Sequence, residues 1–129
     1  MEVEIDRVTY VSHEHPVRRV DTNYIAMVDL SRFELPGMLE QLWLRQVDGG
    51  YEICCLPFYV YGLALGDVVE KNAEDFVTRR VKSSGRRVLR VLFSEAGAED
   101  DSRLSLCEAI ASVGLLSPGV SCDPGMILC

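Results

Sequence analysis

The sequence predicts an α+β fold in which antiparallel β-hairpins form a bent sheet or small barrel, followed by one C-terminal helix and a final short strand. Two observations predict the hairpins. Asp48-Gly49-Gly50 and Ser83-Ser84-Gly85 each separate two apolar runs, and glycine supplies the positive φ that tight turns need. A third observation predicts the helix, because residues 106–113 place apolar side chains at the i, i+3, i+4 and i+7 positions of a helical stripe.

The strands are predicted from apolar or alternating runs bounded by turn residues. Pro57 lacks a backbone donor and ends the strand before it, while Leu35-Pro36-Gly37 marks a loop. The predicted strands cover residues 3–5, 24–30, 39–47, 51–56, 68–71, 76–82, 86–93 and 126–129, and the predicted helix covers residues 102–113.

The length of 129 residues predicts one domain with a core of its own. Residues 1–16 are interpreted as an N-terminal arm, because the polar segment 12–16 ends in a proline that interrupts regular structure. The arm is expected to pair with a sheet edge or with another subunit, and residues 17–129 to form the single α+β domain.

The chain is acidic, with 20 acidic against 13 basic residues, a net charge of −7 and a pI of about 4.8. This charge disfavours binding to nucleic acid and to anionic membranes. The N-terminus lacks the basic and apolar regions of a signal peptide, and no apolar run approaches the roughly 20 residues of a transmembrane helix. We therefore expect a cytoplasmic protein without a membrane partner.

The five cysteines include no CxxC pair and predict neither a metal site nor a redox site. Cys54 and Cys55 are adjacent on a predicted strand, so their side chains should point to opposite faces, one buried and one exposed. His13 and His15 could chelate a metal from one face of a strand, but no third ligand is evident.

No sequence pattern points to catalysis or to a cofactor. Neither a Walker loop nor G-x-G-x-x-G occurs, and no G-x-S-x-G elbow is present. Both histidines lie in the arm, away from any candidate nucleophile. The sequence therefore predicts no catalytic residue, no cofactor and no metal.

Two long segments carry a resemblance to a known family. LEQLWLRQVDGGYEICCLPFYVYGLALGDVV and FVTRRVKSSGRRVLRVLF, together with the strand at residues 24–30, resemble domain-of-unknown-function family 4265, small bacterial proteins mainly of actinomycetes and myxobacteria. The resemblance covers residues 17–93. It implies the fold and the compartment but no activity, because the family's function is unknown.

The first candidate site is the segment after Pro57. In a structural interpretation its aromatic residues fill one end of the sheet, its glycines allow tight turns, and Asp67 caps a turn through its carboxylate. In a functional interpretation the same residues line a pocket or an interface. The candidate residues are Phe58, Tyr59, Tyr61, Gly62, Gly66 and Asp67.

Two charged segments are further candidates. An acidic surface formed by Glu95, Glu99, Asp100 and Asp101 would suit a basic partner. A weak basic patch is formed by Arg79, Arg80, Lys82, Arg86, Arg87 and Arg90. The patch is interpreted as solvated charge that blunts a strand edge, with nucleic-acid binding as a weaker alternative.

These observations favour a non-catalytic protein-binding or regulatory module of the bacterial cytosol, with an immunity or inhibitor-type protein as one concrete version. The alternative is a small-molecule-binding protein or an enzyme with a pocket near Tyr59, Tyr61 and Asp67. A homodimer is also expected, because the apolar strand at residues 126–129 would offer an unpaired edge to another chain.

Overall fold

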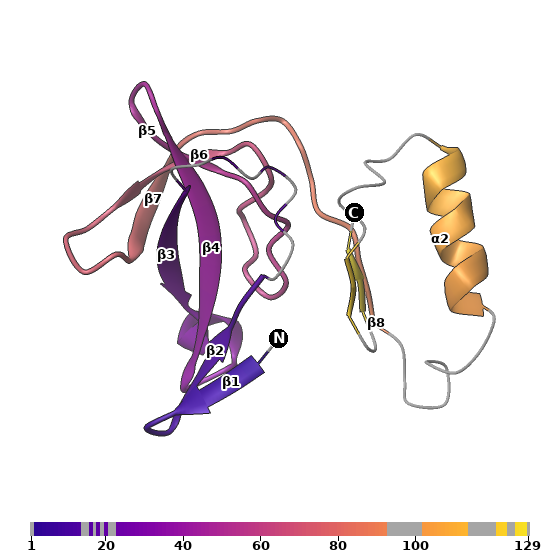
Figure 1. Cartoon of the computed structure of the whole chain (residues 1–129), viewed down its shortest axis with the longest axis horizontal. Coiled ribbons are helices and arrows are strands. Elements are labelled where there is room, and N and C mark those ends of the chain that lie inside the picture. The colour runs from indigo at the N-terminus through magenta and orange to yellow at the C-terminus, as the bar shows by residue number, and fades with distance from the viewer. Residues whose placement is uncertain are drawn as a thin grey trace. The chain divides into compact units, whose positions relative to one another are not determined.

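The computed structural model describes residues 2–13, 16, 18, 20, 23–92, 102–113, 121–123 and 126–128. The chain divides into two compact units, Met1–Arg87 (unit 1) and Val88–Cys129 (unit 2). Figure 1 shows that strands make up most of the described structure, with one α-helix, α2, in unit 2.

Unit 1 contains a mixed sheet of seven strands. The strands are β1 (Glu2–Ile5), β2 (Val8–Val11), β3 (Asn23–Asp29), β4 (Met38–Val47), β5 (Gly50–Ile53), β6 (Val68–Lys71) and β7 (Val77–Lys82). Their order is β1-β2-β4-β5-β6-β7, and β3 pairs with β4. Only β2 and β4 are parallel among these pairs. The sheet is not closed, since β3 and Phe76, the residue before β7, meet through an isolated bridge at Met27.

The predicted hairpin at Asp48-Gly49-Gly50 is confirmed. Val47 pairs with Gly50 across the turn, and Gly49 has a φ of +87°. The next residue, Gly50, has to be a glycine because a Cβ at this position would lie 2.6 Å from the backbone oxygen of Val69. The residue that closes the β4–β5 turn therefore also lets β6 approach β5.

The second predicted hairpin is wrong. Residues 76–82 pair with β6 and not with residues 86–93, and the β6–β7 turn is formed by Asn72, whose side-chain oxygen accepts bonds from Glu74 N (3.1 Å) and Phe76 N (2.9 Å). At Ser83-Ser84-Gly85 the backbone N of Ser84 donates to Asp67. This bond ties the turn to the loop before β6, so the chain does not fold back along β7.

Unit 2 contains a three-stranded antiparallel sheet and the helix α2 (Ser102–Ser112). β10 (Met126–Leu128) is the central strand, flanked by β8 (Arg90–Leu92) and β9 (Ser121–Asp123). α2 begins where the predicted helix of residues 102–113 begins and ends one residue earlier. The described residues of the final strand, Met126–Leu128, have neighbours on both sides, so they offer no open edge. The homodimer stays a prediction without that support.

The N-terminal residues interpreted as an arm contribute to the sheet of unit 1. β1 and β2 form a hairpin, and β2 pairs with β4 through Thr9, Tyr10 and Val11. Glu14 and His15, the second histidine of the H-x-H pair, lie outside the described residues.

The core of unit 1 lies on the face of the sheet that carries alternate residues of β3 and β4. One cluster of this core is formed by Ala26, Leu42, Leu44, Ile53, Cys55 and Val69. The short 3-10 helix η1 (Leu30–Phe33) follows β3, and its first residue is fully buried. None of the helices in the described ranges is long and apolar enough to cross a membrane.

Candidate functional site

A buried carboxylate in β4 organises the loop between β5 and β6. Glu40 is fully buried. Its Oε2 accepts a hydrogen bond from Phe58 N (2.7 Å), and its Oε1 accepts bonds from Tyr59 N (2.8 Å) and Val60 N (3.1 Å). Successive backbone N–H groups of this kind form an anion-binding nest. The nest is filled by the chain's own side chain.

His13 completes the environment of Glu40. Its Nε2 lies 2.9 Å from Glu40 Oε2, and its ring stacks on Phe58 with centroids 4.1 Å apart. The carbonyl oxygen of His13 accepts a hydrogen bond from Trp43 Nε1. With four donors around it, the carboxylate has its acceptor positions filled, so Glu40 is suited to hold the loop and the N-terminal segment rather than to act as a general base.

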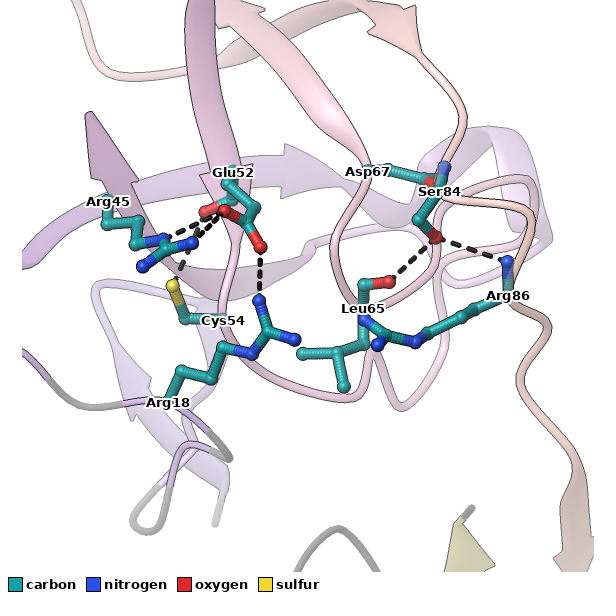
Figure 2. Close-up of polar contacts among 8 residues, drawn as sticks. All are labelled: Arg18, Arg45, Glu52, Cys54, Leu65, Asp67, Ser84 and Arg86. Atoms are coloured by element: carbon teal, nitrogen blue, oxygen red, sulfur yellow. Dashed lines mark hydrogen bonds and ion pairs between the residues drawn. The ribbon is translucent and has the colours of Figure 1, made fainter. Parts of the chain in front are cut away.

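A second carboxylate, Glu52 in β5, is held by two arginines. Arg45 donates from Nε to Glu52 Oε2 at 2.8 Å, and Arg18 donates from Nη1 to Glu52 Oε1. Figure 2 shows Glu52 between the two guanidinium groups, with the Cys54 thiol beside it. The hydrogen bond and charge of Glu52 raise the pKa of Arg45. This cluster joins Arg18 to the sheet.

A third carboxylate confirms the predicted turn cap. Asp67 is almost fully buried, and its oxygens accept bonds from Ala64 N (3.0 Å) and Ser84 N (2.7 Å). Figure 2 shows the Ser84 hydroxyl between the Leu65 carbonyl and the Arg86 backbone N. Asp67 and Ser84 thus fasten the end of β7 to the loop before β6.

The exposed part of this region is aromatic. Tyr61 is 66% exposed, and its ring lies 5.9 Å from that of Phe33 in η1. The guanidinium of Arg32 lies 5.5 Å from the centre of the Phe33 ring. We call Arg32, Phe33 and Tyr61 the aromatic patch. Aromatic residues and arginine at a protein surface are typical of the residues that dominate binding energy in protein interfaces.

The predicted pocket residues do not share one surface. Phe58 is buried. The Tyr59 hydroxyl donates a hydrogen bond to the Glu2 carboxylate at 3.0 Å, and the oxygens of Asp67 accept bonds from Ala64 N and Ser84 N. Gly62 and Gly66 both have a φ of +85°, as turn positions require. Of the six candidates, only Tyr61 and Gly62 are exposed.

The predicted charged surfaces have different outcomes. Glu95, Glu99, Asp100 and Asp101 lie outside the described residues. The basic residues are divided between the units, with Arg90 in unit 2. Arg79 forms two bonds to Glu70, and Arg80 donates to the Gly62 oxygen. These two arginines therefore stabilise the turns around β6 and β7.

The expectation that one of the adjacent cysteines is exposed is wrong. Cys54 and Cys55 follow β5, and both are buried. The carbonyl oxygen of Cys54 accepts a bond from Arg18 N, so Arg18 lies beside the cysteine pair. Burial raises the pKa of both thiols, which keeps them protonated and unreactive. In the part of the chain that the structure describes, no three metal-ligating side chains gather at one place.

Sequence reasoning missed Glu40 and Glu52. The available signal was an acid on the apolar face of a strand, since Glu40 shares its face with Leu42 and Leu44. An acid at such a position must be paired or hydrogen-bonded.

Comparison with known proteins agrees with the resemblance found in the sequence. The family model described as Domain of unknown function (DUF4265) matches residues 40–121. The match includes Glu40, Glu52 and Asp67 and continues into unit 2. No curated protein and no solved structure matches the chain significantly. The chain therefore belongs to the DUF4265 family.

Proposed function

We propose that this chain is a non-catalytic protein-binding module of the bacterial cytosol, an α+β protein whose partner contacts the aromatic patch. The observation that carries the proposal is the exposure of Tyr61, which is 66% exposed beside Phe33 and Arg32. Tyrosine and arginine bury a large area with few rotatable bonds to immobilise, which makes them effective anchors for a partner.

The internal chemistry supports a binding role over a catalytic one. Among the described residues, Glu40, Glu52 and Asp67 are buried carboxylates, and each accepts hydrogen bonds that hold the fold together. Both buried thiols are kept neutral. A catalytic acid or base needs a free position facing a substrate, and these groups are already engaged.

An immunity or inhibitor-type protein remains the concrete version of the proposal. Its predicted acidic surface lies outside the described residues, so the aromatic patch is the surface to test. The patch is formed by the loop that Glu40 fixes and by η1, whose Phe33 ring contacts that of Tyr61. Such an ordered platform lowers the entropic cost of binding.

The experiment places a photo-crosslinking amino acid at position 61 and, as the matched control, at Val113, which is similarly exposed at 71%. We expect one protein to be crosslinked in native bacterial lysate from position 61 and not from position 113. The Tyr61→Ser variant should compete less well than the unmodified chain for that partner, by about tenfold or more.

Equal crosslinking from both positions would overturn the proposal, as would equal competition by Tyr61→Ser. Mass spectrometry of the purified chain tests the alternative at the same time. A retained small molecule without a protein partner would favour the ligand-binding role near Tyr59, Tyr61 and Asp67.

A further inference from the structure

β1 is the last strand at one end of the sheet of unit 1, and among the described strands it pairs with β2 alone (Figure 1). The bonds of β2 show which backbone groups of β1 are free. Thr9 lies opposite Glu4, but its N–H donates to the Gly37 oxygen at 2.8 Å, away from β1. Glu4 and Thr9 are therefore a pair without hydrogen bonds to each other, and the N–H and C=O of Glu4 point to the open edge. Those of Glu2, two residues earlier, point the same way.

The side chains of these two residues make one face of β1 acidic. Glu2 and Glu4 are both exposed. The Tyr59 hydroxyl donates to Glu2 at 3.0 Å, and among the described residues no base forms an ion pair with either acid. The negative charge of this face is thus uncompensated and suits a basic partner.

The opposite face of β1 is apolar. Val3 and Ile5 are 40% and 56% exposed. Val3 lies beside Tyr10 of β2, and Tyr10 lies beside Leu39 of β4, so the apolar surface continues across three strands. Tyr10 and Leu39 are only partly buried. A strand added to β1 would extend this surface, and its own apolar side chains would pack beside Val3 and Ile5.

Two other strands of unit 1 have a side without a strand partner, and both are less suited to accept one. In β3, Met27 N donates to the Asp75 oxygen at 2.7 Å, so the turn before β7 covers the middle of that edge. In β7, the register with β6 skips Thr78 and Val81, and such irregularities disfavour the addition of a regular strand. Among the described strands of unit 1, β1 alone is regularly paired on one side and open along its whole length on the other.

Charge excludes a second copy of the chain as the occupant of this edge. The free backbone groups of a second β1 also belong to its glutamates, so pairing would place acids opposite acids, which destabilises a strand pair. Among the described strands, β7 alone carries more than one basic residue. Its Arg79 is bonded to Glu70, and its Arg80 donates to the Gly62 oxygen. The complementary strand must therefore come from a different protein.

We propose that β1 accepts a strand from another protein, an extended segment in which basic residues alternate with apolar ones. In an antiparallel register, two basic residues lie opposite Glu2 and Glu4 and exchange backbone hydrogen bonds with them. The apolar residue between the two bases then lies opposite Val3. No residue of the aromatic patch belongs to this surface, so the inference does not depend on the proposed function.

The first test uses a short peptide of alternating valine and lysine as the probe. Titrated into the isotope-labelled chain, it should shift the NMR signals of the Glu2 and Glu4 amides, with a dissociation constant of about millimolar or lower. A peptide with glutamate in place of lysine should leave both signals unchanged. Glu4→Lys should weaken binding roughly tenfold. Glu74→Lys makes the same change of charge at an exposed turn position and should bind like the unmodified chain.

The second test separates strand pairing from attraction between charges. In the proposed register the lysine N–H groups of the peptide bond to β1, and the valine N–H groups point away from it. N-methylation of the lysines should therefore abolish binding, whereas N-methylation of the valines should leave it within about twofold.

A peptide that shifts neither amide signal at millimolar concentration would overturn the inference. Equal loss of binding on N-methylation of lysines and of valines would also overturn it, as would equal effects of Glu74→Lys and Glu4→Lys, because net charge would then be the cause. Tyr61→Ser should bind the peptide like the unmodified chain. A loss of binding in that variant would assign the peptide to the aromatic patch and refute the site at β1.

Discussion

His13 Nε2 lies 2.9 Å from Glu40 Oε2, and both side chains are buried. The contact joins the N-terminal segment to β4, while the same carboxylate binds three consecutive backbone N–H groups of the loop after Pro57. One side chain thus fixes two segments that are far from it in sequence.

Replacement of Glu40 by glutamine should destabilise unit 1 strongly. The amide keeps one acceptor oxygen but presents its NH2 group to backbone donors, so buried N–H groups lose their partner. We expect the free energy of unfolding to fall by about 3 kcal/mol in denaturant titrations. Glu74→Gln, at an exposed position, should change it by about 0.5 kcal/mol or less. Equal effects of the two variants would contradict the role of Glu40.

Gly49→Ala and Gly50→Ala should differ although the two residues are adjacent. A Cβ on Gly49 meets no atom within 4 Å, so the cost is that of a positive φ alone, about 1 kcal/mol. A Cβ on Gly50 would lie 2.6 Å from the backbone oxygen of Val69, and β6 would have to move. We expect a loss of about 3 kcal/mol for Gly50→Ala. Similar unfolding midpoints for the two variants would refute the close approach of β5 and β6.

The parts of the fold that could be predicted are those that local chemistry determines. Asp48-Gly49-Gly50 allows only a tight turn, so the β4–β5 hairpin follows from the sequence. Asp67 next to Gly66 also signals a capped turn. The partner of residues 76–82 could not be predicted, because strands precede and follow this segment at similar distances. The side chains of Asn72, which accepts a bond from Phe76 N, and of Asp67, which accepts one from Ser84 N, decide between them.

The candidate site could be predicted only in part. Tyr61 was named as an interface residue and is exposed, but its neighbour Phe33 comes from η1, which no pattern connects to the loop. Glu40 was missed because its donors lie 18 to 20 positions further along the chain. Contacts at that separation depend on the folded sheet and not on local sequence.

Cys54 and Cys55 should resist alkylation in the native protein. Both thiols are buried, and burial raises the pKa of each, so little thiolate forms at a pH just below the ordinary pKa of a free thiol. Treatment with N-ethylmaleimide followed by peptide mapping should find both unlabelled, and both labelled after unfolding. Val113→Cys supplies an exposed thiol as the positive control. Native labelling of Cys54 at the rate of the control would contradict the burial of its thiol.

The capping carboxylate Asp29 should make stability depend on pH in the acid range. Its side chain accepts bonds from the hydroxyl and the backbone N of Ser31, which lower the pKa of Asp29 below 3.8. Because the pKa is lower in the folded state than in the unfolded chain, the stabilisation is fully present above 3.8 and is lost as the pH falls through the folded value. A titration of the Asp29 carboxyl carbon by NMR measures the shift directly. Ser31→Ala removes the hydroxyl bond, which is the largest cause of the shift, and should move the pKa of Asp29 back towards 3.8. An unshifted Asp29 pKa in the unmodified chain would show that the Ser31 groups do not bind the ionised carboxylate.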